Sequence, residues 1–90
     1  MLTAVKLAMG ITVDNYDAEL MDLINAAFLD LSAFAGVTFT EANADALVRR
    51  AVITYCRANF RSPSDYDRIK AAYDEQKAQL QTATGYGQEA

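Results

Sequence analysis

Residues 14–36, DNYDAELMDLINAAFLDLSAFAG, carry the pattern that decides the fold class. Their apolar side chains recur at steps of three and four positions, which is the period of an α-helix with one face in a core. The members of this stripe are Leu20, Leu23, Ile24, Ala27, Phe28, Leu31 and Ala35. We expect Asp14 to cap the start of the helix and Gly36 to end it, because aspartate and glycine favour these positions.

Two further segments, one on each side, continue the helical pattern. Residues 2–9 predict a short amphipathic helix that stops at Gly10. Residues 43–60, NADALVRRAVITYCRANF, carry apolar side chains on more than one face, so this helix is expected to be the most buried. It has to stop near Arg61, because a residue that precedes proline avoids helical backbone angles.

The C-terminal part of the chain predicts a long, charged helix from residue 63 to about residue 83. Ser62 is the expected cap and Pro63 suits the first helical position. Asp65 stands three residues after the serine, which approximates a capping box.

The apolar side chains of this last helix form a narrow, heptad-like seam. Its members are Tyr66, Ile69, Tyr73, Gln76, Leu80 and Ala83. Opposite charges three residues apart are expected to pair on the rest of its surface: Asp67 with Lys70, and Asp74 with Lys77. Such a helix packs its seam either against its own domain or against another chain.

These segments together predict an all-α fold, a small bundle of about four helices with a long C-terminal helix. We expect a single helical domain over residues 1–84 and a flexible C-terminal tail over residues 85–90. A chain of 90 residues buries only about 60–65% of its unfolded surface on folding. Burial against an oligomer or a partner therefore stays open as a contribution to its stability.

The composition argues against catalysis. The chain has no histidine, the commonest metal ligand and general base. Its single cysteine, Cys56, stands in the apolar segment AVITYCRANF and is expected to be a small buried hydrophobe. We therefore expect no enzyme activity, no cofactor and no metal. We expect neither a secretion signal nor a membrane span, because the first residues lack a basic leader before a long apolar region and no apolar run reaches the roughly 18 residues that a span needs.

Charge is unevenly distributed along the chain, whose formal net charge is −4. Residues 8–47 contain acidic but no basic side chains, whereas residues 49–70 are mainly basic. These are either two solvated faces or two surfaces that complement each other between subunits of a ring. The candidate subunit-interface residues are Asp17, Glu19 and Asp22 on the acidic side and Arg50, Arg57 and Arg61 on the basic side.

The C-terminal helix and tail supply the candidate residues for docking a partner, which are Tyr73, Leu80 and Tyr86. Tyr86 stands between two glycines, and one buried tyrosine can supply much of the binding energy of an interface.

With these helices placed, the chain resembles the small head-to-tail connector proteins of long-tailed bacteriophages, also called adaptor or head-completion proteins. The resemblance spans almost the whole chain and rests on ITVDNYDAELMDLINAA, LVRRAVITYCRANF and SPSDYDRIKAAYDEQKAQLQTATGYG. Its most specific part is YDRIKAAYDEQKAQL with the TGYG end.

The resemblance implies an all-helical structural protein that assembles as a homo-oligomeric ring under the portal protein. Such a ring extends the DNA channel and docks head-closure or tail-completion proteins. DNA is expected to pass through without specific binding, since the chain is acidic and a protein that grips DNA neutralises phosphates with lysine and arginine. The expected location is the head-tail junction of the virion, after synthesis in the host bacterial cytoplasm.

Two other classes of function remain open from the residues alone. Arg50, Arg57 and Arg61 are spaced by seven and four, which suits the recognition face of a helix-turn-helix DNA-binding regulator. A helical partner-binding module would use the last helix without forming a ring.

Overall fold

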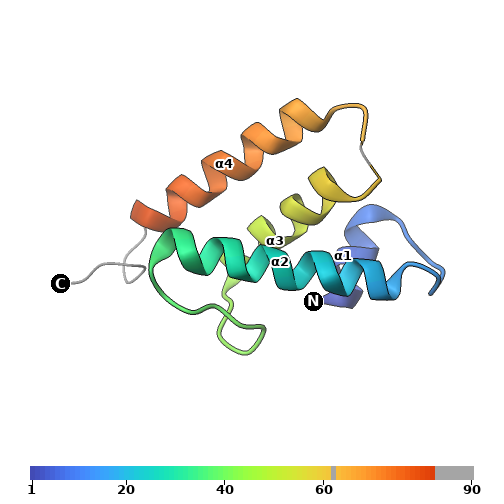
Figure 1. Ribbon diagram of the computed structural model, residues 1–90, viewed down its shortest axis with the longest axis horizontal. Helices are drawn as coiled ribbons and strands as arrows, with labels where there is room; N and C mark the ends of the chain where they lie inside the picture. Colours follow the sequence, from blue (N-terminus) through green and yellow to red (C-terminus); the bar gives the residue numbers. More distant parts are fainter. Residues whose placement is uncertain (62, 83–90) are drawn as a thin grey trace.

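The computed structural model describes residues 1–61 and 63–82 and folds them into four α-helices (Figure 1). The helices are α1 (Leu2–Met9), α2 (Asp17–Ala35), α3 (Ala46–Asn59) and α4 (Tyr66–Thr82). No strand occurs within this described part of the chain. The predicted all-α fold of about four helices is confirmed, whereas the predicted tail, residues 85–90, lies outside the described residues.

The two central helices hold the bundle together. α2 and α3 each pack against all three of the other helices. The chain reverses direction after α3, so that α4 runs back along it (Figure 1).

Left-handed glycines end the first two helices, as predicted. Gly10 has φ 72°, and its N–H group and that of Ile11 donate to carbonyls in the last turn of α1. Gly36 has φ 78° and closes α2 with a bond from its own N–H group to the carbonyl of Ser32 at 2.9 Å. Ile11 and Val37, which follow the two glycines, pack against the core, the hydrophobic contact that usually accompanies such helix ends.

The predicted start of α2 is wrong. Asp14 caps no helix, and α2 begins at Asp17 after Tyr16, whose side chain makes no capping bond. The carboxylate of Asp14 instead accepts a hydrogen bond from the ammonium group of Lys6 at 2.9 Å. The turn after α1 brings these two opposite charges together, and the bond between them is charged at both ends.

The predicted start of α4 is also wrong. Pro63 precedes the helix instead of opening it, and Ser62 lies outside the described residues. The helix begins at Tyr66, and the N–H group of Ile69 donates to the carbonyl of Asp65 at 3.1 Å. Residues between α3 and α4 are needed to turn the chain back along α3, so they are not available for helix.

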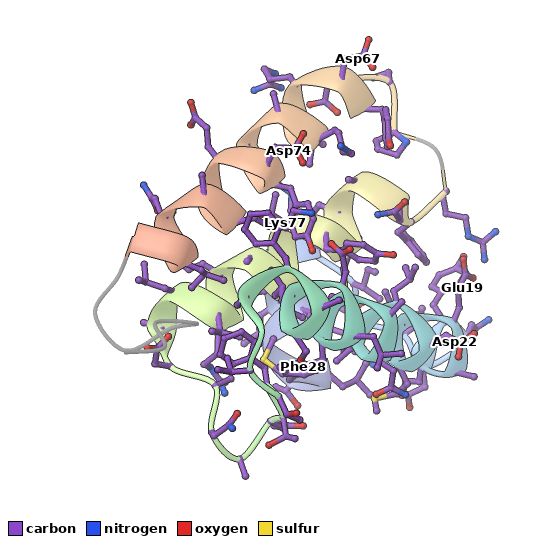
Figure 2. The ribbon with its side chains drawn as sticks, turned by 60° about the vertical axis from the view of Figure 1, so that its left-hand side comes forward. Glu19, Asp22, Phe28, Asp67, Asp74 and Lys77 are labelled. Atoms are coloured by element: carbon purple, nitrogen blue, oxygen red, sulfur yellow. The ribbon has the colours of Figure 1, made fainter. Side chains whose placement is uncertain are left out.

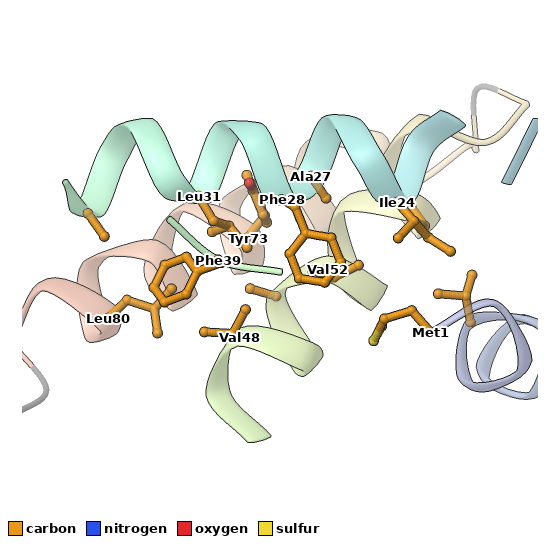
Figure 3. Close-up of a cluster of buried hydrophobic side chains, with 14 of the residues drawn as sticks. Met1, Ile24, Ala27, Phe28, Leu31, Phe39, Val48, Val52, Tyr73 and Leu80 are labelled. Atoms are coloured by element: carbon orange, nitrogen blue, oxygen red, sulfur yellow. The ribbon is translucent and has the colours of Figure 1, made fainter. Parts of the chain in front are cut away.

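One hydrophobic core joins all four helices (Figure 3). Every member of the predicted α2 stripe is buried except Leu23, which is half-buried and packs against the core. Phe39, from the loop between α2 and α3, is 5% exposed and packs into the same cluster. From α4, the seam residues Ile69, Tyr73 and Leu80 are buried, so this helix lies across its own domain.

Leu31→Ala is expected to lower the free energy of unfolding by about 2–5 kcal/mol, because Leu31 is fully buried and its truncation leaves a cavity. Leu29→Ala is the matched control on the same helix, since Leu29 is 72% exposed, and its effect should stay within about 0.5 kcal/mol. Urea denaturation of both variants as dilute monomers measures the difference. Equal losses would contradict this orientation of α2.

Candidate functional site

The groups that the sequence singles out for chemistry are buried or dispersed. Cys56 is fully buried, and burial raises the pKa of its thiol to about 12. Among the described residues, no three or more cysteine, aspartate and glutamate side chains are grouped so that they could hold a metal ion. No described helix is long and apolar enough to cross a membrane. The surfaces of the helices are therefore the place to look for function.

Asp17, a predicted interface residue, is paired inside the chain. The ammonium group of Lys6 donates to its carboxylate at 2.8 Å as well as to Asp14. The hydrogen bonds to Asp17 and Asp14 raise the pKa of Lys6, which stays charged at neutral pH. This cluster fastens α1 to the start of α2.

Glu19 and Arg61, predicted for opposite sides of an interface between subunits, also meet inside the chain. The Arg61 guanidinium donates to the Glu19 carboxylate at 3.0 Å. It also stacks 4.8 Å from the ring centroid of Tyr16, which itself packs edge-on against Phe60. Arg61 has φ 63°, a left-handed conformation that is rare for a residue other than glycine. These contacts hold the end of α3 against the start of α2.

The other three predicted interface residues, Asp22, Arg50 and Arg57, are exposed. None of them has an ion pair within the described parts of the chain. Figure 2 shows Asp22 close to Glu19 in the first half of α2. Arg50 lines a pocket between α3 and α4, and Arg57 lines another beside Met9. The structure thus leaves one acidic and two basic candidates for other molecules.

A polar cluster joins α2 to α4. The Tyr73 hydroxyl donates to the Asp30 carboxylate at 2.6 Å, and the Lys77 ammonium donates to the same oxygen at 3.2 Å. Lys77 also lies 4.9 Å from the ring centroid of Phe34. The predicted pairing of Lys77 with Asp74 is wrong, because α2 brings Asp30 within its reach.

This cluster lowers the pKa of Asp30. Partial burial by itself raises that pKa, but the hydrogen bonds from Tyr73 and Lys77 outweigh the burial. Burial and the bond to Asp30 raise the pKa of Tyr73. At neutral pH Asp30 is therefore ionised, and the Tyr73 hydroxyl keeps the proton that it donates to Asp30.

The three predicted docking residues have different surroundings. Tyr73 and Leu80 are buried in the core of their own chain, at 3% and 0% exposure. A contact of these side chains with a partner would require α4 to leave the core, and it stays a prediction. Tyr86 lies outside the described residues.

Sequence reasoning missed an apolar surface on α2. Met21 and Leu29 are 39% and 72% exposed and line a groove of about 460 Å³ between α2 and the loop that follows it. The sequence did carry a signal of this surface. After Asp22, the only charged residue of α2 is Asp30, whose carboxylate contacts Tyr73 of α4. A helix face without charge that is not buried is a candidate for an interface.

A model of the family described as phage connector protein matches residues 1–87 of the chain. No curated protein and no solved structure matches it significantly. The match covers all four helices and the loops between them.

Asp30→Asn is expected to destabilise the protein by roughly 1 kcal/mol or less near pH 6, because the Asp30 carboxylate is partly exposed. The pKa of Asp30 is lower in the folded protein than in the unfolded chain, where it is about 4. Its charge therefore stabilises the fold at pH values above about 4, and this stabilisation is lost as the pH falls through the folded pKa. The difference in urea midpoint between wild type and variant should therefore shrink from pH 6 to pH 3.

The control for this pH series is Asp67→Asn, which removes an exposed carboxylate of α4 that has no ion pair in the described residues (Figure 2). Asp67 stands in the first turn of α4, where the helix dipole favours a carboxylate, so this variant should lose less stability at pH 6 than Asp30→Asn. A difference between wild type and Asp30→Asn that grows on acidification would contradict the cluster.

Proposed function

The chain belongs to the phage connector protein family, and from this membership we propose that it is a structural protein of the phage head-to-tail junction. In this proposal it assembles as a homo-oligomeric ring under the portal protein, extends the DNA channel, and docks head-closure or tail-completion proteins. The observation that carries the proposal is the family match, which extends over nearly the whole chain.

The charge of the chain suits a conduit for DNA. Its formal net charge is −4, and repulsion between acidic side chains and phosphates keeps a passing duplex from binding. Two of the arginines, Arg50 and Arg57, are exposed, but Arg61 is paired with Glu19. DNA then moves through the ring without a specific contact.

The arrangement of the helices favours the connector over the helix-turn-helix regulator. Arg61, one of the three arginines of the predicted recognition face, packs against Tyr16 and pairs with Glu19. Residues 36–45 separate α2 from α3, whereas a helix-turn-helix uses a turn of about 3–4 residues. No contact in the described residues favours the partner-binding module over the connector.

The proposal is tested by removing the gene from the phage that encodes the chain. We expect filled or leaking heads and separate tails, since the two parts would lack their joint, and plasmid-borne wild-type protein should restore joined virions. Electron microscopy of lysates and mass spectrometry of purified virions give the readout. Normal infectious virions without the protein would overturn the proposed function.

Removal of residues 84–90 is expected to leave the free energy of unfolding within about 0.5 kcal/mol of the wild type, since residues up to Leu80 already form one core from all four helices. The same truncation should weaken the joining of heads to tails, because it removes Tyr86. Tyr86→Ala in the full chain tests the tyrosine side chain alone, because the backbone of residues 84–90 is kept. An unfolded truncated protein would contradict a role limited to docking.

A further inference from the structure

The outer face of α2, formed by Met21, Asp22, Asn25 and Leu29, has no partner within the described residues of the chain. All four residues are exposed, and Leu29 has 72% of its surface in solvent. Asp22 is the only charge among them. Apolar side chains around one unpaired carboxylate combine the two features that make a specific interface, a buried centre and a charge that selects the partner.

A second surface lies between α3 and α4 and is called here the α3/α4 groove. Its volume is about 330 Å³, and its walls are formed by Leu47, Arg50, Ala72, Glu75, Gln76 and Gln79. Leu47 is 38% exposed and Arg50 has no ion pair in the described residues.

The two surfaces face different directions. α4 meets α2 through Tyr73 and Lys77, which contact Asp30. Glu75 and Gln79 of the groove lie about 160° around α4 from Lys77, on the flank that faces away from α2. On α2, Met21 and Asn25 lie about 180° and 140° around the helix from Asp30, and Leu29 and Asp22 lie about 100° and 80° from it. One molecule therefore presents two unlike surfaces that do not overlap, as a head-to-tail contact requires.

We propose that the outer face of α2 in one copy binds the α3/α4 groove of the next copy, with Asp22 opposite Arg50. This inference rests on the proposed ring and names the surfaces that close it. Leu29 and Met21 then pack against Leu47.

Charge also restricts how the two surfaces meet. Glu75 repels Asp22 wherever Asp22 is not beside Arg50, so it restricts the register of the contact. A second copy of the chain thus brings a carboxylate to Arg50.

Charge reversal tests the pairing, with light scattering and sedimentation of the purified full chain up to millimolar concentration. Asp22→Arg and Arg50→Glu should each raise the dissociation constant of self-association at least about tenfold, because each places like charges opposite one another. The double variant should associate again. An equal mixture of the two single variants should also associate, because every contact in an alternating assembly then joins opposite charges.

Asp67→Arg is the matched control, with the same change of charge at an exposed site on α4 away from Asp22 (Figure 2). It should leave self-association unchanged, and circular dichroism should show that all variants are folded. Single reversals that assemble like the wild type would overturn the pairing, and so would a wild type that stays monomeric throughout.

These outcomes are separate from those for the proposed function, which depends on the joining of heads to tails in the phage. If the single charge reversals assemble like the wild type while the gene deletion gives no joined virions, the proposed connector function stands and this interface is rejected. Normal virions in the deletion would reject the connector whatever the reversals do.

Discussion

The packing of the α2 stripe against α3 and α4 is the contact on which the rest of the structure depends. A chain of this length builds a single core, and each of these helices contributes fully buried side chains to it, among them Leu31, Val52 and Leu80. α4 depends on this contact most, because its apolar seam is narrow and its other faces are charged. The Asp30 cluster adds a directional bond that fixes how α4 lies on α2.

Ion pairs inside the chain determine which charges remain for other molecules. Lys6 forms an ion pair with Asp17, and Arg61 forms one with Glu19. Neither acid can pair with another molecule without the loss of this internal contact. Exposed pairs of this kind contribute little to stability, but they select which charges face solvent unpaired. Asp22, Arg50 and Arg57 remain, and Asp22 and Arg50 lie on surfaces that point in different directions.

A small core and an exposed apolar helix face suit a protein that completes its burial in an assembly. A contact that forms only between folded copies stabilises the folded state by mass action. In the proposed ring this couples folding to assembly, and the acidic net charge limits contact with DNA in the proposed channel. In the proposed interface, Leu29, which is costly to expose in a lone monomer, becomes part of the joint between subunits.

The sequence by itself determined the helical class, the buried stripe of α2, the glycine ends of α1 and α2, and the resemblance to connectors. These depend on periodicity and on local backbone preference, which neighbouring residues carry. The sequence did not predict correctly where α2 and α4 begin. Asp14 pairs with Lys6 instead of capping α2, and Pro63 lies in the turn between α3 and α4 instead of in the helix. Only the tertiary structure decided which charges pair, because packing brings together residues as distant as Asp30 and Lys77, 47 positions apart.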